Sequence, residues 1–357
     1  MTVDSGTDST PWRTTLRHGV VIPAHPLALT DAKRLDERRQ RALTRYYVAA
    51  GAGGIAVGVH TTQFAIRRRD VGLYQPVLEL AAAALDERGM HRESPFVRVA
   101  GICGDTAQAV GEASVAAALG YHVGLVSLAG MERATDDTLL DHLRQVGQVI
   151  PVMGFYLQPA VGGRVLSSAF WHRAVEIETL VAIKIAPFDR YRTLDVIRAV
   201  ADSGRHDDLA LYTGNDDHIV LDLLTAFQLA ADMPVLHIVG GLLGQWAVWT
   251  TRAVETHAEC RALVRSRSAV PAELLTRAAQ ITDANAAIFD AAHGFAGVIP
   301  GIHEVLRRQG MLCGTWCLDD GERLAPAQAE SITRAIDRYP HLTDDDFVTA
   351  HLDEWMR

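Results

Sequence analysis

Residues 150–186, IPVMGFYLQPAVGGRVLSSAFWHRAVEIETLVAIKIA, decide the fold class. The segment begins and ends with short apolar runs, 150–156 and 180–186, and residues 167–177 between them have the apolar spacing of a helix. Each run is apolar without alternation, which indicates a strand covered on both faces, as in a parallel sheet beneath helices. The segment therefore predicts a strand–helix–strand unit with parallel strands.

Outward from this segment, the same pattern recurs over most of the chain. Apolar runs begin 25 to 42 residues apart, close to the ~30 residues that a βαβ unit needs. The eight runs are 18–25, 54–59, 96–103, 122–128, 150–156, 180–186, 209–214 and 234–241. Eight such units close into an α/β fold, the (β/α)8 or TIM barrel. A doubly wound sheet is the alternative, but it would usually place a Gly-rich turn after its first strand, where this chain has IPAHPLAL.

The pattern also predicts how the chain is divided. Residues 1–14 are rich in Ser, Thr and Asp, and we expect them to form a disordered tail. Residues 15–265 hold the barrel, and 266–357 form a helical C-terminal extension. Helical patterns in the extension lie near 271–293, 299–310, 325–338 and 343–355. They could pack on the barrel or between subunits.

Composition limits the partners and the compartment. The 357 residues are 48% apolar, and 34 basic against 43 acidic side chains give a net charge of −9, without a basic cluster that would hold nucleic acid. No apolar run reaches the ~18 residues of a membrane span, and the first dozen residues lack the pattern of a secretory signal. We therefore expect a cytoplasmic protein without nucleic-acid or membrane partners. Four scattered cysteines predict reduced thiols.

Lys184 is the most informative residue at a predicted strand end, where barrel enzymes carry their reactive groups. It lies in the apolar run VAIKIA, and burial lowers the pKa of a lysine, so that the neutral amine can attack a carbonyl. Of the 34 basic residues, only Lys33 and Lys184 are lysines. A lysine on a core strand of such a chain indicates a role that arginine cannot take, namely imine formation. The alternative is a lysine that extends to solvent or pairs with a carboxylate.

Two further strand ends complete the predicted site. Tyr156 ends the preceding strand, 28 residues before Lys184, and we expect its phenol beside the amine as a proton shuttle; a packed ring is the alternative. Thr61 and Thr62 follow the second strand, after His60. Their hydroxyls and N–H groups suit the carboxylate of a 2-oxo acid, although Thr pairs are also common in turns.

These residues resemble motifs of the dihydrodipicolinate synthase / N-acetylneuraminate lyase family, class I aldolases and dehydratases that form a Schiff base. The resemblance runs from about Gly19 to the helices beyond residue 300. The G-T-T-G-E loop of the family is similar to residues 60–64, Y-N-x-P to 156–159, G-I-K to 182–184 and S-G-D-D to 213–216, and the HIVGG stretch 237–241 stands in place of G-x-x-S.

The resemblance implies a role for each residue. Lys184 forms the imine with pyruvate or a related 2-oxo acid, and Tyr156 relays protons. Thr61 and Thr62 hold the carboxylate, and His60, Gly214 and Gly240 complete the substrate site. The second substrate is an aldehyde, no cofactor or metal is needed, and the family implies a homodimer or homotetramer. Phe155, Trp171, Trp246 and His60 are candidate pocket walls.

The chain also departs from the family. The T-P-Y-Y loop after strand four is replaced by SLAGMER, residues 127–133. Ala160 and Val161 stand where the synthases have an arginine for the second carboxylate of their substrate, and Arg164 is out of register. These changes disfavour an authentic dihydrodipicolinate synthase. They favour aldol cleavage or condensation by an imine, with dehydration of a 2-oxo sugar acid through the same imine as an alternative.

Two other functions stay open. His25, His60 and His237 with Asp105 lie on or after neighbouring predicted strands and could hold a divalent ion in a metal-dependent lyase. The altered loops after strands two and four are also compatible with a non-catalytic relative that binds a 2-oxo acid.

Overall fold

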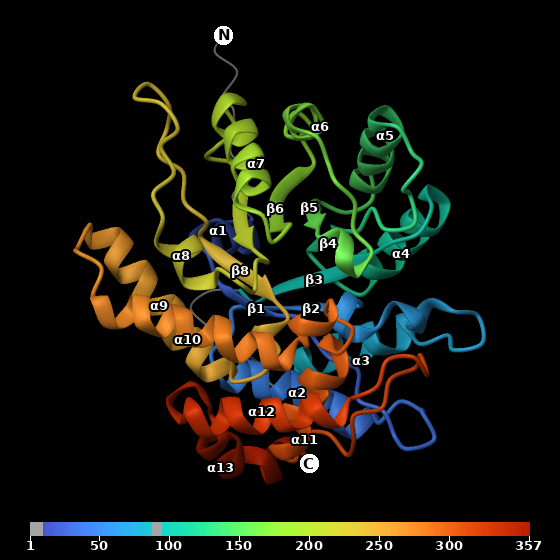
Figure 1. Cartoon of the computed structure of the whole chain (residues 1–357). Coiled ribbons are helices and arrows are strands. Elements are labelled where there is room, and N and C mark those ends of the chain that lie inside the picture. Colours follow the sequence, from blue (N-terminus) through green and yellow to red (C-terminus); the bar gives the residue numbers. More distant parts are fainter. Residues whose placement is uncertain (1–9, 88–94) are drawn as a thin grey trace.

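Eight short parallel strands form a barrel in the computed structural model, which describes residues 10–87 and 95–357 (Figure 1). The strands are β1 (Val21–Pro23), β2 (Gly54–Val57), β3 (Val97–Ile102), β4 (Val123–Val126), β5 (Val152–Leu157), β6 (Leu180–Ala186), β7 (Ala210–Thr213) and β8 (Gly240–Leu243). They are hydrogen-bonded in the order β1-β8-β7-β6-β5-β4-β3-β2. A parallel bridge between Ala24 and Ala56 joins β1 to β2, where the His25 N–H donates to the Ala56 carbonyl at 2.8 Å. The predicted TIM barrel is confirmed.

Helices follow the strands and surround the barrel. They are α2 (Glu37–Ala49), α3 (Tyr74–Glu87), α4 (Thr106–Ala118), α5 (Asp136–Gly147), α6 (Ser168–Ala174), α7 (Arg190–Asp202), α8 (Ile219–Leu224) and α9 (Thr250–Ser266). Several begin where a polar side chain accepts a hydrogen bond from a free backbone N–H, as Asp105 does for α4, Thr135 for α5 and Ser167 for α6.

The strands are buried on both faces because two apolar layers meet at the sheet. On β5, Met153, Phe155 and Leu157 belong to the core inside the barrel, whereas Val152 and Tyr156 belong to the layer between sheet and helices. Alternate residues of a strand point to opposite faces. The continuous apolar runs of the sequence are the consequence.

The C-terminal extension consists of α10 (Ala272–Ile288), α11 (Val298–Arg308), α12 (Pro326–Arg338) and α13 (Asp345–Trp355), within a few residues of the predicted helices. Figure 1 shows these orange and red helices gathered at one side of the barrel. Helix α10 contacts α8, and α13 contacts α2. The Tyr46 hydroxyl donates to Asp344 at 2.7 Å and Arg45 donates to the Trp355 carbonyl, so the extension packs on the barrel of its own chain.

The N-terminal segment differs from the prediction. Residues 1–9 of the expected tail lie outside the described residues, but Pro11–His18 form helix α1, so the prediction is wrong for residues 11–14. The helix ends at Gly19, and its Leu16 enters the core inside the barrel. The Tyr212 hydroxyl of β7 donates to the Leu16 carbonyl at 2.8 Å. Apolar burial therefore orders a segment whose composition indicated a tail.

The eighth strand also lies later than predicted. The run 234–241 was expected to be this strand, but β8 begins only at Gly240, which is paired with Tyr212 of β7. Leu236 instead forms an isolated antiparallel bridge with Phe227. Apart from His237, residues 234–243 are all apolar or glycine, so the run alone did not show where in it the strand begins. Gly240 opens the strand, and Gly244 follows its C-terminal end.

Among the described residues, no helix combines the length and the apolar character needed to cross a membrane.

Candidate active site

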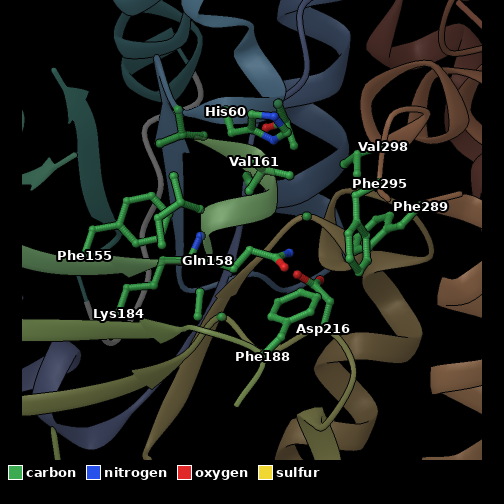
Figure 2. A pocket seen from close by; sticks show the side chains of 17 residues that line it. His60, Phe155, Gln158, Val161, Lys184, Phe188, Asp216, Phe289, Phe295 and Val298 are labelled. Carbon is green, nitrogen blue, oxygen red and sulfur yellow. The ribbon is translucent and has the colours of Figure 1, made fainter. Parts of the chain in front are cut away.

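Lys184 lies on β6 at the bottom of a cavity at the C-terminal end of the barrel. The cavity measures about 580 Å³ out to its open mouth. It is lined by Ala24, Val59, His60, Thr61, Phe155, Leu157, Gln158, Val161, Lys184, Ala186, Phe188, Gly214, Asp216, Gly244, Phe289, Phe295 and Val298. Figure 2 shows the Lys184 side chain extending into this space, and its Nζ lies 4.4 Å from the centre of the Phe155 ring. Only 9% of the lysine is exposed.

Gly214, at the end of β7, makes room for the lysine. A Cβ atom built on this residue would lie 2.5 Å from Lys184 Cε and 2.7 Å from the Ala186 Cβ. Any larger residue would displace the amine. The structure thus brings Gly214 and Lys184 together, and the glycine acts by leaving space.

Burial and one carboxylate set the charge of the amine. Burial lowers the pKa of Lys184 to about 8, and the negative charge of Asp216 opposes that shift. Burial raises the pKa of Asp216 to about 7, against the Gln245 N–H and the charge of Lys184, which lower it. Near neutral pH the cavity therefore holds a lysine close to losing its proton and a carboxyl close to gaining one.

Asp216 is held from two directions. Its Oδ1 accepts the Gln245 N–H at 3.0 Å, and its backbone carbonyl accepts the Asn285 amide of α10 at 2.7 Å. The preceding residues are anchored to Asp222 of α8, which accepts hydrogen bonds from the Thr213 hydroxyl at 2.6 Å and the Asn215 amide at 3.0 Å. The T-G-N-D sequence at 213–216 is thus a rigid turn that positions Gly214 and Asp216.

The turn after β2 contributes Thr61 and His60 to the cavity, but not Thr62. The Thr62 hydroxyl donates to the His25 carbonyl at 2.6 Å and accepts the Gly58 N–H, so it holds the turn together. Thr61 lines the cavity and makes a longer bond, 3.3 Å, to the same carbonyl. Burial, with the nearby charge of Lys184, lowers the pKa of His60 to about 4, so His60 is neutral at pH 7.

Tyr156 faces away from Lys184, and the predicted contact between phenol and amine is wrong. Its hydroxyl donates to the Leu166 carbonyl at 3.1 Å and accepts the Leu166 N–H, and its ring packs on Trp171 in the helical layer. The residue of β5 paired with Lys184 is Phe155. Paired residues of parallel strands share a face, so the neighbouring Tyr156 points to the other side.

Other predicted site residues also lie outside the cavity. A Cβ on Gly240 would meet the Val20 carbonyl and the Tyr212 ring, which places this glycine at the N-terminal end of the barrel, and Gly244 takes its place at the cavity. Trp171 packs on Phe170 in the outer layer, and Trp246 packs on His257. Of the four candidate walls, Phe155 and His60 line the cavity.

The residues of the metal hypothesis are not brought together. His25 is fully buried, and its Nε2 bonds to the Thr44 hydroxyl at 2.9 Å. Asp105 caps α4, and His237 lines a groove between α8 and α9. Across residues 10–87 and 95–357, no group of three His, Cys, Asp or Glu side chains is arranged to hold a metal ion.

The sequence did not indicate several of the residues that line the cavity. Asp216 was recognised only as part of a motif, and Phe188 follows β6 without a signal of its own. Phe289, Phe295 and Val298 come from the extension, more than 100 residues beyond Lys184, and no local pattern connects them with the barrel. Only the packing of α10 and the following turn against the barrel brings them to the cavity.

Neither a protein-family model nor a curated protein matches the sequence. Solved structures do match in shape. YagE, a prophage protein of the dihydrodipicolinic acid synthase family from E. coli K12 in complex with pyruvate, matches with a TM-score of 0.72 at 16% identity, covering 90% of this chain and 98% of that chain. Dihydrodipicolinate synthase from Bacteroides thetaiotaomicron has a TM-score of 0.71 at 14% identity, with coverages of 90% and 98%.

N-acetylneuraminate lyase from Fusobacterium nucleatum matches with a TM-score of 0.69 at 15% identity, covering 90% of this chain and 99% of that chain. Identities this low establish the fold but not the chemistry. The chain has the fold of the dihydrodipicolinate synthase / N-acetylneuraminate lyase family, a (β/α)8 barrel with a helical C-terminal extension.

Proposed function

We propose that this protein is a lyase that forms an imine between Lys184 and pyruvate or a related 2-oxo acid, and that it catalyses aldol cleavage or condensation with an aldehyde. The observation that carries the proposal is the position of the amine. Lys184 is the one lysine of the cavity wall, it is buried among apolar side chains, and its pKa is lowered to about 8. The shared fold with an aldolase and synthase family supports the same reading.

The proposed reaction begins with the neutral amine. The lone pair of Lys184 Nζ attacks the C2 carbonyl carbon, and a proton moves from nitrogen to oxygen to give the carbinolamine. A second proton, given by the Asp216 carboxyl, protonates the hydroxyl, and water leaves to give the protonated imine and the Asp216 carboxylate. The Asp216 carboxylate takes the proton of the C4 hydroxyl, the C3–C4 bond breaks with its electron pair passing to the imine, and the aldehyde departs from the resulting enamine. Protonation of the enamine at C3 and hydrolysis of the imine then release the 2-oxo acid and the free amine. Condensation is the reverse. Dehydration of a 2-oxo sugar acid would use the same imine and is the alternative.

Asp216 is the group best suited to move protons in this reaction. Its carboxyl lines the cavity with Lys184, and a pKa of about 7 lets it hold or release a proton near neutral pH. This role replaces the one expected of Tyr156. Thr61 remains the proposed donor to the substrate carboxylate, with neutral His60 beside it, whereas Thr62 supports the turn.

Authentic dihydrodipicolinate synthase activity is not proposed. The described residues that line the cavity include no arginine, and Arg164 donates to the Met131 and Ala134 carbonyls at 2.7 and 3.1 Å. A second substrate carboxylate therefore has no guanidinium to bind. The homodimer or homotetramer and the cytoplasmic location stay predictions.

Borohydride trapping tests the proposal, because the chain contains only two lysines. Wild-type protein treated with pyruvate and sodium borohydride should gain one covalent pyruvate per chain, and Lys184→Arg should gain none. Lys33→Arg is the matched control, since Lys33 is bound at the surface to Asp320 and should not affect trapping. Adduct on Lys184→Arg, or none on wild type, contradicts the proposal. An adduct that forms without turnover of any aldehyde would favour the non-catalytic 2-oxo acid binder.

A further inference from the structure

Three phenylalanines form a wall at the mouth of the cavity: Phe188 after β6, and Phe289 and Phe295 from the extension. We call these three side chains the aromatic wall. We propose that the aromatic wall binds an uncharged, apolar group, aryl or branched alkyl, carried by the substrate beyond its reacting carbons. The proposal rests on the proposed function, since it names the substrate class of the same site.

The cavity is divided by polarity along its length. Figure 2 shows Lys184 and Phe155 at one end and Phe289, Phe295 and Val298 at the other, with Asp216 and Phe188 between them. Beyond Asp216 the labelled side chains of the extension are all apolar. A substrate whose carbonyl reaches Lys184 therefore extends its far end against hydrocarbon.

The backbone of the aromatic wall is strained. Phe188 has φ 52° and Phe295 has φ 68°, a region that bulky L-residues rarely occupy. Such strain costs on the order of 1–3 kcal/mol per residue and persists where the surroundings impose it, often at ligand sites. The Asn215 amide oxygen accepts the Phe188 N–H at 3.0 Å, and the Asp290 carbonyl accepts the Phe295 N–H at 3.2 Å.

The rings of Phe188 and Phe295 pack against each other. Their centres lie 5.6 Å apart at an interplanar angle of 87°, an edge-to-face contact between the barrel and the extension. Both residues stay half-buried at the mouth, whereas Phe289 behind them is 4% exposed and adjoins Gly244. The contact therefore fixes an apolar surface that still faces the cavity.

Charge at the mouth favours the same class of substrate. Of the described residues that line the cavity, Lys184 is the only Lys or Arg, and the pKa of His60 is lowered to about 4, so His60 carries no positive charge at pH 7. A carboxylate or phosphate at the far end would lose water and gain no cation. An apolar group would instead bury hydrocarbon against the aromatic wall.

Calorimetric binding of two acids without a ketone tests the proposal separately from imine formation. The probes are 3-phenylpropionate and glutarate, which share one carboxylate and differ in having a phenyl ring or a second carboxylate. We expect 3-phenylpropionate to bind with a Kd about tenfold lower or better, the effect of burying the ring. Equal Kd values, or tighter binding of glutarate, overturn the proposal.

Variants of the aromatic wall show which side chains are responsible for the binding of 3-phenylpropionate. Phe295→Ala should raise the Kd of 3-phenylpropionate about tenfold, and Phe188→Leu, which keeps an apolar side chain, should raise it less. Phe347→Ala removes a phenylalanine of α13 that packs on Tyr46 and is the control without effect on the Kd. If Phe295→Ala leaves the Kd unchanged, the aromatic wall is not the binding surface.

The trapping experiment separates this result from the proposed function. If no pyruvate adduct forms while 3-phenylpropionate still binds more tightly than glutarate, imine formation is refuted and the binding role of the aromatic wall stands. If the pyruvate adduct forms normally while the two acids bind with equal Kd, imine formation stands and the binding role of the aromatic wall is refuted.

Discussion

At the scale of single residues, the surroundings of Lys184 Nζ decide the chemistry. Burial of the side chain disfavours the charged ammonium, while the carboxylate of Asp216 and the face of the Phe155 ring, 4.4 Å from Nζ, favour it. Gly214 leaves the space through which the side chain reaches the cavity. Reactivity here follows from the balance of desolvation and one nearby charge.

Replacing Asp216 should shift the pH dependence of imine formation. The trapping rate in wild type should rise with pH through about 8, as the amine loses its proton. Because the Asp216 charge raises the pKa of Lys184, Asp216→Asn should lower that pKa and move the rise to lower pH, while still accepting the Gln245 N–H. Trapping rates between pH 6 and about 9.5 measure the shift. Asp320→Asn at the surface is the control, and a profile that moves to higher pH contradicts the assignment.

Tyr156→Phe should leave trapping unchanged and lower stability. The hydroxyl bonds to the Leu166 backbone and interacts with the Arg192 side chain of α7, on the far side of the sheet from Lys184. Loss of these buried bonds should reduce the free energy of unfolding by about 1–3 kcal/mol. Urea denaturation and the trapping rate are the two measurements. A slowed adduct with unchanged stability would return the tyrosine to the mechanism.

At the scale of elements, the positions of most strands could be predicted from the sequence, but the face of the sheet to which each side chain points could not. Continuous apolar runs located β5 and β6, because a sheet covered on both sides demands them. The same continuity hides which residues point inward, and an error of one position turns every side chain to the other face. This is why Lys184 could be assigned to a site while Tyr156 could not. On β8 the same lack of alternation hid the strand boundary, so Gly240 was placed at the wrong end of the barrel.

A buried ion pair holds the turn that carries His60 and Thr61. Arg67 donates to both Glu112 oxygens at 2.9 and 3.0 Å and to the Gly58 and Gly101 carbonyls, which ties the ends of β2 and β3 to α4. Both side chains are less than a tenth exposed. The pair therefore joins β2, β3 and α4 next to the turn that carries His60 and Thr61.

Arg67→Met should lower the free energy of unfolding by about 3–5 kcal/mol, because it leaves Glu112 buried without its cation. The double variant with Glu112→Leu should recover part of this loss. Arg173→Met breaks the exposed pair with Asp137 and should cost at most about 1 kcal/mol. Urea denaturation compares the three; similar losses for Arg67→Met and Arg173→Met would contradict the argument.

At the scale of the whole molecule, the extension completes the site. The sequence predicted its helices, since their apolar periodicity is local, but their contacts with the barrel depend on packing across the chain. Asn285 of α10 holds the Asp216 carbonyl, and Gln63 after β2 accepts the Leu318 N–H at 2.6 Å. Together with the aromatic wall, these contacts join the extension to both sides of the cavity.

Asn285→Ala should weaken the contact between α10 of the extension and the turn that carries Asp216. The Asp216 carbonyl would lose a buried donor, at a cost of about 1–3 kcal/mol in the free energy of unfolding, and the carboxyl would be less firmly placed. We expect slower trapping of pyruvate by a folded protein, measured beside urea denaturation. Gln280→Ala, on the exposed side of the same helix, is the control. Unchanged trapping would show that the extension does not position Asp216.

A crystal structure of the protein soaked with pyruvate would show whether Lys184 Nζ bonds covalently to C2 of a 2-oxo acid, the bond on which the proposed reaction depends. We expect continuous electron density from Nζ to C2, with the carboxylate beside Thr61. Pyruvate density separated from Nζ, or a Lys184 side chain directed out of the cavity, would contradict it.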